Sequence, residues 1–284
     1  MSRHFGLACR SGVAVLAMLA GAGSAPALAE GPRIVSMNVC TDQLLITLAD
    51  PEQILGLSRF SRDTWASFAA EEARHYPILS GAAEDVLVLK PDIVVASLFD
   101  KRSTRELLKA NGLHLVESSV PRNLDEVKAQ IRQMGEIAGH PDRATAEIAR
   151  LDAAAARARG VVAEKHYRVL PLSRRGWVAG TDSLLSSLLS ETGLFNAAGD
   201  LGVSGGGFAS LEAIVNARPD FIVVSGAGDR AEDDGQAFLL HPALERFYPP
   251  AKRIVIPERL TVCGGVMLAD ALDLLVAELQ RVER

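Results

Sequence analysis

The sequence predicts an α/β protein of two similar Rossmann-like lobes joined by one long interdomain helix. Short β-branched runs alternate with helical patterns along the chain, which is typical of mostly parallel sheets covered by helices. A segment that begins at residue 84 recurs at residue 212, and a long helical pattern lies between the copies. We therefore assign a leader to residues 1–29, a first lobe to 30–140, a helix to 141–165 and a second lobe to 166–284.

The first 29 residues have the features of an export signal. Arg3 and Arg10 give a basic start, the apolar run Val13–Ala22 follows, and Ala27–Ala29 offers small residues where a signal peptidase reads. The apolar run is about half of the roughly 20 residues that a membrane-spanning helix needs. A retained membrane anchor is the alternative. We expect a mature chain that begins at Glu30 and lies in the periplasm.

The mature chain is expected to be acidic. The full sequence has 30 Lys and Arg residues against 35 Asp and Glu residues. The leader contains two of the basic residues and none of the acidic ones, so its removal leaves 28 against 35. Because binding to phosphates needs a basic surface, the composition argues against nucleic acid as a partner.

Six β-branched runs are expected to form strands, and amphipathic stretches between them predict helices. The predicted strands are Arg33–Ser36, Asp92–Ser97, His114–Glu117, Tyr167–Leu172, Phe221–Ser225 and Arg253–Pro257. The predicted helices include Thr41–Leu48, Ser103–Ala110 and Ser183–Thr192. Ligands of such folds bind beyond the carboxyl ends of the strands, so the loops that follow the strands are the expected site.

An internal repeat is the most informative feature. Glu84–Ser97 recurs as Glu212–Ser225, with Glu, Pro, Asp, Val and Ser in register. Each copy predicts a short helix, a break at a Lys-Pro or Arg-Pro pair, and a buried strand, because proline cannot continue a helix. The alternative is that this order of elements is a common α/β junction. We interpret the repeat as two lobes of similar build.

Two further helices are expected between the copies. Leu124–Ala138 is the first, and Pro141 suits the first turn of the second, which continues to about Lys165 through the alanine-rich stretch Ala153–Ala158. A helix of roughly 22 residues spans about 33 Å. This helix is expected to be a stiff strut between the lobes; the alternative is a helix packed on one face of a single domain.

The start of the mature chain resembles a known family. Ile34–Asn38 and Thr41–Leu45 look like the first strand and helix of the periplasmic binding proteins for ferric siderophores, haem and cobalamin. The repeat copies resemble that family's paired helix–Pro–Asp–strand elements. The resemblance implies two lobes with a ligand cleft between them. It also implies the solute-binding component of an ABC importer, which captures a small-molecule metal chelate and delivers it to a permease in the inner membrane.

The family also carries a surface glutamate on each lobe that docks onto arginines of the permease. The matching positions are Glu84 and Glu212. An acidic residue in a first helical turn also suits the helix dipole, which is the alternative explanation. The equivalence of the two positions across the repeat favours docking. We further expect a monomer with no catalytic residue, no resident metal and no cofactor of its own.

Ligand contacts are expected from loops that follow strands, which we place at Met37–Cys40, Arg59–Trp65, Phe99–Arg102, Ser173–Trp177 and Arg259–Gly265. The candidate ligand-binding residues in these loops are Arg59, Phe60, Trp65 and Phe99 in the first lobe, and Arg174, Arg175, Trp177 and Arg259 in the second. Arginine offers a planar fork of donors for carboxylate or catecholate oxygens, and aromatic faces cover the apolar parts of a chelate. The alternative is that surface loops carry arginine without a ligand.

The chain departs from the family pattern at three places. Val39 and Cys40 stand where a proline and small residues are common, and the tryptophan often found before the last helix is replaced near Leu260. These departures weaken an assignment to cobalamin or another corrinoid. The number of arginines instead favours an anionic ferric chelate.

Cys40 and Cys263 remain after removal of the leader. In an oxidising compartment such a pair predicts a disulfide, and free thiols or a soft metal ligand are the alternatives. Both are expected in cleft loops, one in each lobe, so a bond between them would fix the separation of the lobes. Two other functions stay open: a cysteine-dependent enzyme, with Cys40 activated at a helix start, and binding of a bare metal ion. The scattered histidines offer neither a clear partner base nor a metal-ligand spacing.

Overall fold

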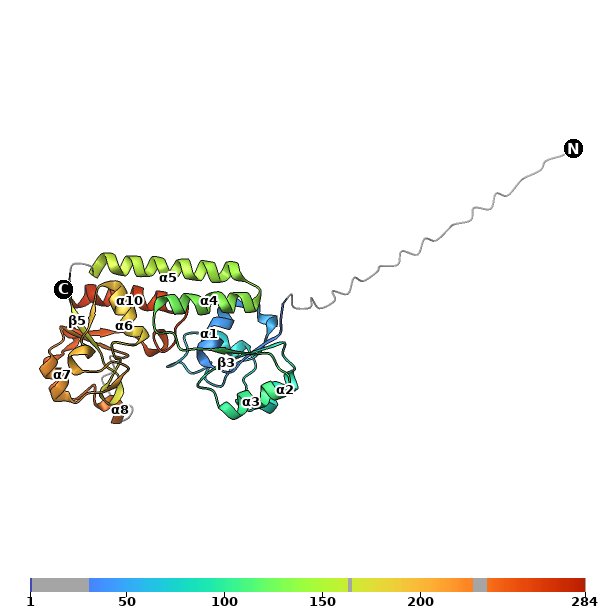
Figure 1. Ribbon diagram of the computed structural model, residues 1–284. Coiled ribbons are helices and arrows are strands. Elements are labelled where there is room, and N and C mark those ends of the chain that lie inside the picture. Colours follow the sequence, from blue (N-terminus) through green and yellow to red (C-terminus); the bar gives the residue numbers. More distant parts are fainter. Residues whose placement is uncertain (2–30, 163–164, 227–233, 284) are drawn as a thin grey trace.

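The computed structural model describes residue 1 and residues 31–162, 165–226 and 234–283. The predicted leader and the predicted mature start at Glu30 lie outside the described residues. Within the described ranges, no helix combines the length and the apolar character needed to cross a membrane. Two halves, each built around a parallel sheet, lie side by side beneath a long helix (Figure 1).

The first half contains a sheet of four parallel strands in the order β2-β1-β3-β4. Its strands are β1 (Ile34–Ser36), β2 (Ile54–Gly56), β3 (Ile93–Ser97) and β4 (Leu115–Ser118). Its helices are α1 (Val39–Leu48), α2 (Ala83–Leu89), α3 (Arg102–Ala110) and α4 (Leu124–Ala138). All three residues of β1 are buried, because this strand has neighbours on both edges.

The second half contains a sheet of the same size in the order β10-β9-β5-β7, and β6 pairs with β8 in a small antiparallel ribbon. The strands are β5 (Arg168–Pro171), β6 (Trp177–Val178), β7 (Phe195–Asn196), β8 (Gly207–Phe208), β9 (Phe221–Val224) and β10 (Arg253–Val255). The helices are α6 (Leu184–Thr192), α7 (Leu211–Ala217), α8 (Asp234–Ala237), α9 (Pro242–Phe247) and α10 (Leu268–Val282). The structure therefore confirms the predicted α/β fold with two parallel sheets.

Several helices begin at a residue whose side chain caps the first turn. Asn38, Asn123, Ser183 and Ser210 precede α1, α4, α6 and α7, and each accepts a hydrogen bond from a backbone N–H of the helix that follows. Such caps satisfy N–H groups that have no partner within a helix. The starts of these helices are therefore encoded locally in the sequence.

The two copies of the repeat have the same backbone geometry. Helices α2 and α7 end at Lys90 and Arg218, each in the left-handed region with φ of 48°. In both copies the next residue is proline, which cannot continue the helix. The break that the sequence predicts is thus a left-handed turn that aims the chain into the next strand.

The same pair of residues closes this turn in each half. Arg33 donates from its guanidinium group to the last carbonyls of α2, and its N–H is accepted by Asp92 Oδ2 at 2.7 Å. In the second half, Arg168 donates to the last carbonyls of α7, and its N–H is accepted by Asp220 Oδ2 at 2.8 Å. The aspartate of the repeated Pro-Asp pair therefore accepts an equivalent hydrogen bond in both halves.

Helix α5 (Pro141–Val162) packs along its length against α4 of the first half and α10 of the second (Figure 1). Its buried face consists mainly of alanine, which lets neighbouring helices approach closely, with Leu151 at its centre. Arg150 and Arg157 bind Asp270 and Asp273 of α10 at 3.2 Å and 2.8 Å. Residues 163 and 164 of the predicted helix lie outside the described residues.

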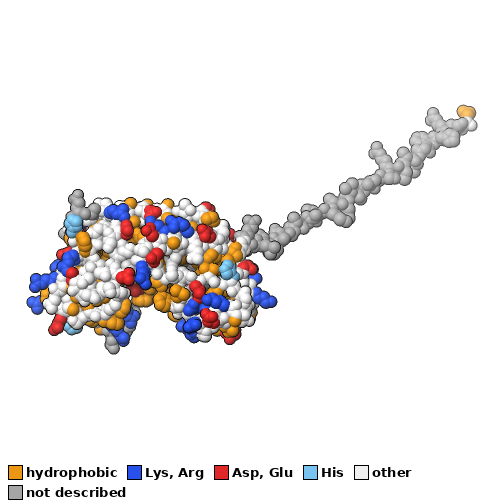
Figure 2. Space-filling view, in the orientation of Figure 1, with side chains coloured by type: hydrophobic (Ala, Val, Ile, Leu, Met, Phe, Trp, Pro, Cys, Tyr) orange, Lys and Arg blue, Asp and Glu red, His pale blue; other side chains and the backbone are white. Residues whose placement is uncertain are grey.

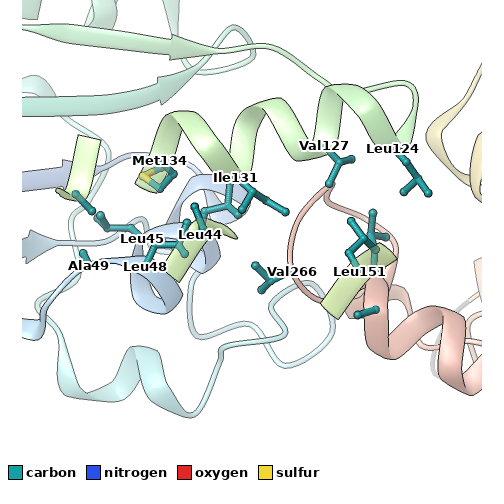
Figure 3. Packing of buried hydrophobic residues seen from close by; sticks show 14 of the residues in the cluster. Leu44, Leu45, Leu48, Ala49, Leu124, Val127, Ile131, Met134, Leu151 and Val266 are labelled. Atoms are coloured by element: carbon teal, nitrogen blue, oxygen red, sulfur yellow. The ribbon is translucent and has the colours of Figure 1, made fainter. Parts of the chain in front are cut away.

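The main hydrophobic core runs across both halves. Leu44 and Leu45 of α1, Ile131 of α4 and Leu151 of α5 belong to the same buried cluster as Val266 before α10 (Figure 3). Burial of each such side chain contributes about 1.5–3 kcal/mol. The two halves are therefore joined by packing, and not only by the continuity of the chain.

Candidate ligand-binding site between the two halves

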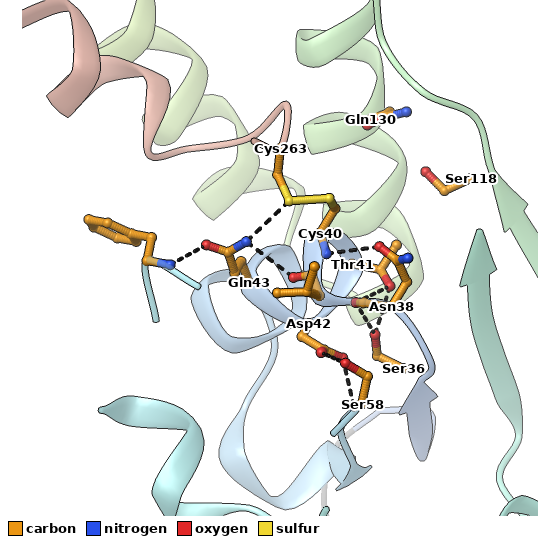
Figure 4. The surroundings of a disulfide bond; sticks show 12 residues. Ser36, Asn38, Cys40, Thr41, Asp42, Gln43, Ser58, Ser118, Gln130 and Cys263 are labelled. Atoms are coloured by element: carbon orange, nitrogen blue, oxygen red, sulfur yellow. Dashed lines mark hydrogen bonds between the residues drawn. A yellow bond between two sulfur atoms is a disulfide. The ribbon is translucent and has the colours of Figure 1, made fainter. Parts of the chain in front are cut away.

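A disulfide joins the halves at the start of α1. Cys40 is bonded to Cys263, with their Cα atoms 5.3 Å apart and 223 residues between them in the sequence (Figure 4). Cys263 lies in the loop before α10, as expected, but Cys40 lies in the first turn of α1 and not in a loop. The helix begins at Val39, two residues before the predicted start at Thr41, because the Asn38 side chain accepts the Cys40 N–H at 2.9 Å.

Close packing accompanies this bond. Cys263 is buried, and the next residue is Gly264. A Cβ atom on Gly264 would lie 2.3 Å from Pro121 Cγ and 2.9 Å from Val127 Cγ2 of the first half. Only glycine allows the backbone of the second half to approach the first half so closely here.

A pocket of about 520 Å³ lies between the halves beside the disulfide. Its wall includes hydroxyl and amide side chains from both halves, among them Asn38, Thr41, Ser118, Gln130, Ser183 and Thr261. Apolar surface comes from Leu44, Phe99, Val120, Leu184 and Val262. A space-filling view shows the molecule hollowed between the halves, with hydrophobic side chains gathered there (Figure 2). The size and the mixed wall are those of a site for a small molecule.

Charge at this pocket comes from one ion pair between the halves. Arg122 Nη1 lies 3.5 Å from Asp182 Oδ2, and both side chains are largely exposed. Exposed pairs contribute at most about 1 kcal/mol. The pocket therefore presents mainly neutral hydrogen-bonding groups to a ligand.

A smaller pocket of about 230 Å³ adjoins the first in the first half. It is lined by Ser58, Arg59, Phe60, Phe99, Asp100 and Lys101, among others. The guanidinium carbon of Arg59 lies 4.7 Å above the centre of the Phe60 ring. Phe99, which is 80% exposed, lines both pockets.

The structure brings together three of the eight candidate ligand residues. Arg59, Phe60 and Phe99 share the smaller pocket, and Trp65 is half-exposed on the segment that follows Phe60. Neither described pocket is lined by Trp65 or by the four candidates of the second half. A ligand contact at these positions stays a prediction.

The second-half candidates lie in two 3-10 turns and in β6. Arg174 and Arg175 form a 3-10 turn before β6, in which Arg175 is left-handed with φ of 58°. The Trp177 ring meets the Phe208 ring edge-on at 5.1 Å. Arg259 is exposed and lies in a second 3-10 turn beside Glu258. Burial raises the pKa of Glu258, and the positive charge of Arg174 opposes this rise.

The expected ligand loops contain only part of the larger pocket. Asn38 lies in the loop after β1 and Thr261 in the loop before α10, and both loops were expected to contact the ligand. Ser118 and Ser119 stand where β4 ends, a position after a strand that was not singled out. Gln130 reaches the pocket from α4 and Ser183 from the cap before α6, and nothing local in the sequence marks them.

A buried acid, Asp42, lines neither pocket but bonds to Ser58 of the smaller one. Burial raises the pKa of Asp42 to about 7, although hydrogen bonds from Ser36 and Ser58 act in the opposite direction. Among the described residues, no group of three or more His, Cys, Asp or Glu side chains is placed to hold a metal ion. Glu84 and Glu212 are both exposed, each as the second residue of its helix.

This fold and this pocket define a two-lobed α/β binding protein. Residues 34–253 match the family model of periplasmic binding proteins, and the chain belongs to this family. It is 25% identical over 227 residues to a cobalamin-binding protein of Halobacterium salinarum, an alignment that covers 76% of this chain and 60% of that protein. The chain thus spans less than two thirds of that relative's length.

Solved structures show the same fold. The periplasmic heme-binding protein RhuT from Roseiflexus sp. RS-1 matches with a TM-score of 0.71 and 24% identity, covering 89% of this chain and 99% of that one. An ABC-type Fe3+-hydroxamate transport system from Saccharomonospora viridis DSM 43017 matches with a TM-score of 0.67 and 19% identity, covering 88% and 93%.

Proposed function

We propose that this protein is the periplasmic solute-binding component of an ABC importer for a metal chelate of the ferric siderophore or cobalamin type. The observation that carries the proposal is the pocket of about 520 Å³ between two halves of a periplasmic binding protein fold. The names of the matched proteins refer to cobalamin, heme and Fe3+-hydroxamate, and each of these is a metal chelate. Membership of the same family makes a chelate the best-supported ligand class.

The wall of the pocket suits a chelate whose metal is already enclosed. Hydroxyl and amide side chains such as Ser118 and Gln130 bind the polar rim of such a ligand, and Phe99 and Leu184 cover its apolar surface. Arg59 and Lys101 in the adjoining pocket offer positive charge to an anionic arm of the same ligand. An anionic ferric chelate would use both pockets, and a neutral one would use the larger.

The disulfide bears on the location and on the competing functions. Bonded cysteines persist in oxidising compartments such as the periplasm. A cysteine in a disulfide has no thiolate, so a cysteine-dependent enzyme would lack its nucleophile. We therefore favour binding without turnover, by a monomer.

Ligand capture is tested by native mass spectrometry against haemin, cyanocobalamin, a ferric trihydroxamate and a ferric tris-catecholate. We expect one chelate per chain, released with its mass unchanged. Val120→Trp should abolish binding, because Val120 lines the larger pocket and a tryptophan would fill it. Val88→Trp is the matched control, since Val88 is an exposed valine on α2 that lines neither pocket. Binding of a bare metal ion in preference to every chelate, or a chemically altered ligand, would contradict the proposal.

Delivery to the permease is proposed to use Glu84 and Glu212. Support comes from their exposure, from their equivalent places in α2 and α7, and from the position of both helices on the side away from α5 (Figure 1). We expect Glu84→Ala with Glu212→Ala to leave chelate affinity unchanged and to impair uptake into vesicles that contain the partner importer.

A double variant of other exposed glutamates, Glu106→Ala with Glu245→Ala, is the control for this test. Like the docking pair, it removes one acid from each half. Each single docking variant is expected to be mild, because an exposed ion pair contributes under about 1 kcal/mol. Normal uptake by the double docking variant would make both residues ordinary helix-start acids.

A further inference from the structure

Two adjacent polar side chains of α1, Asp42 and Gln43, are completely buried. Polar groups are rarely buried without hydrogen-bonding partners, because the loss of water is costly. Both residues find partners in one segment, Ser58–Phe68, which follows β2 and contains neither helix nor strand. Burial of this pair is therefore linked to the placement of a single segment.

Asp42 holds the beginning of the segment. Its Oδ1 accepts the Ser58 N–H at 3.1 Å, and its Oδ2 accepts the Ser58 hydroxyl at 2.5 Å (Figure 4). Both oxygens thus face donors, and the ionised carboxylate is the form that accepts from both. Hydrogen bonds to an ionised acceptor are shorter and stronger than those between neutral groups.

Gln43 holds the end of the segment. Its Oε1 accepts the Phe68 N–H at 2.7 Å, while its Nε2 donates to the Val39 carbonyl at 3.2 Å and lies 3.4 Å from Cys263 Sγ (Figure 4). The end of the segment is therefore fixed beside the disulfide that joins the halves.

The segment carries an aromatic face. Phe60, Trp65 and Phe68 are 48%, 46% and 39% exposed, and Phe60 lines the smaller pocket together with Phe99. Exposed aromatic side chains held in place are typical of a recognition surface. The buried hydroxyls of Ser61 and Ser67 have no partner among the described residues, so they add no hydrogen bond to hold the segment.

Charged groups around Asp42 act on its protonation. Burial is the largest effect and raises its pKa to about 7, and Asp100 in the loop after β3 adds to the rise. Asp100 itself accepts the Ser97 N–H at 2.7 Å and has Arg105 of α3 beside it as the opposing charge. The two uncharged neighbours that bond to Asp42 are Ser36 of β1 and Ser58.

We propose that Asp42 and Gln43 are positioning residues of the ligand site, which hold the Ser58–Phe68 segment so that its aromatic side chains present a fixed face to the ligand. The part that concerns the ligand rests on the proposed function. Loss of either acceptor, the Asp42 carboxylate or the Gln43 amide oxygen, loosens the segment, so ligand affinity falls.

Acrylamide quenching of Trp65 tests the positioning without any ligand. The chain has two tryptophans, so Trp177→Phe leaves Trp65 as the reporter. In this background we expect Asp42→Asn and Gln43→Met each to give stronger quenching, because each removes an acceptor that holds one end of the segment.

The matched control is Gln53→Met. Gln53 is equally buried, but its side chain donates to the Ala138 carbonyl at 3.0 Å, which lies outside the segment. Its loss should lower stability and leave Trp65 quenching unchanged. The positioning role is refuted if acrylamide quenches Trp65 equally in Asp42→Asn, in Gln43→Met and in the Trp177→Phe background. It is also refuted if Gln53→Met raises the quenching of Trp65 as much as these two variants do.

Affinity is then measured with otherwise unmodified protein, with a neutral ferric trihydroxamate and cyanocobalamin as probes. We expect Asp42→Asn and Gln43→Met each to raise the Kd of the probe that binds about tenfold at about pH 8. An unchanged Kd in both variants would overturn the proposal. If quenching is stronger in Asp42→Asn but neither probe nor any other chelate binds, the anchoring stands and the proposed function fails.

Discussion

Removal of the disulfide between the halves is expected to lower the stability of the protein strongly. The bond closes a loop of 223 residues. In the chain-entropy model, a loop of this length restricts the unfolded chain enough to contribute about 5 kcal/mol, near the upper end of the range for native disulfides. We therefore expect Cys40→Ser with Cys263→Ser to reduce the free energy of unfolding by about 4–5 kcal/mol.

Urea unfolding followed by circular dichroism measures this loss. The midpoint should fall, because the variant is less stable, and the slope should rise, because an unfolded chain without the cross-link exposes more surface. A reducing agent should bring the unmodified protein to the behaviour of the variant and should leave the variant unchanged. If the double serine variant unfolds at the midpoint of the oxidised protein, the bond does not stabilise the junction and the argument from loop length fails.

Two other changes probe the same junction. Because burial raises the pKa of Asp42 from 3.8 to about 7, the folded chain holds this proton more tightly than the unfolded chain. The free energy of unfolding should therefore fall by up to about 4 kcal/mol as pH rises from about 4 to about 7. Urea titrations across this pH range measure the fall, and Asp42→Asn should make the free energy of unfolding less dependent on pH. Gly264→Ala should cost about 1–3 kcal/mol, since the new methyl group meets Pro121. Gly205→Ala, with open space around it, is the control, and equal urea midpoints for the two variants would contradict the close approach.

Elements of the fold that depend on local signals could be predicted from the sequence. The ends of six strands lie within two residues of the predicted ends, because β-branched patterning and breaks at proline are local signals. These strands are β1, β3, β4, β5, β9 and β10. The predicted strands omit β2, with three residues, and β6, β7 and β8, with two each. None of these contains a run of β-branched residues, and each exists through pairing with distant partners, which periodicity does not reveal.

The glycine-rich stretch Gly202–Gly207 shows the same limit. Its composition predicts a loop, and most of it is one, but Gly207 pairs with Val178 in the ribbon of β6 and β8. A Cβ atom on Gly206 would lie 2.7 Å from the Trp177 ring. The glycines make room for this aromatic side chain, which is a tertiary requirement and not a sign of a free loop.

The candidate site could be predicted only in part. Phe99 follows a predicted strand, whereas Arg59 and Phe60 were found by their chemistry, since β2 before them was not predicted. Most of the hydroxyl-lined wall was not found, because serine and glutamine are common on surfaces and converge here only through the packing of the two halves. Asp42 and Gln43 illustrate the limit best: on an amphipathic helix they are expected to face water, but the Ser58–Phe68 segment covers them.

The first turn of α1 combines two opposing contributions to stability. Asp42 costs up to about 4 kcal/mol when it is ionised, whereas the bond at Cys40, two residues earlier, contributes about 5 kcal/mol. An apolar residue in place of Asp42 would avoid the cost but would leave the Ser58 N–H and hydroxyl without their acceptor. The disulfide therefore offsets the penalty of a buried acid within the same helical turn. An acid is retained in this packed junction because its two oxygens accept both donors of Ser58, where the aromatic segment begins.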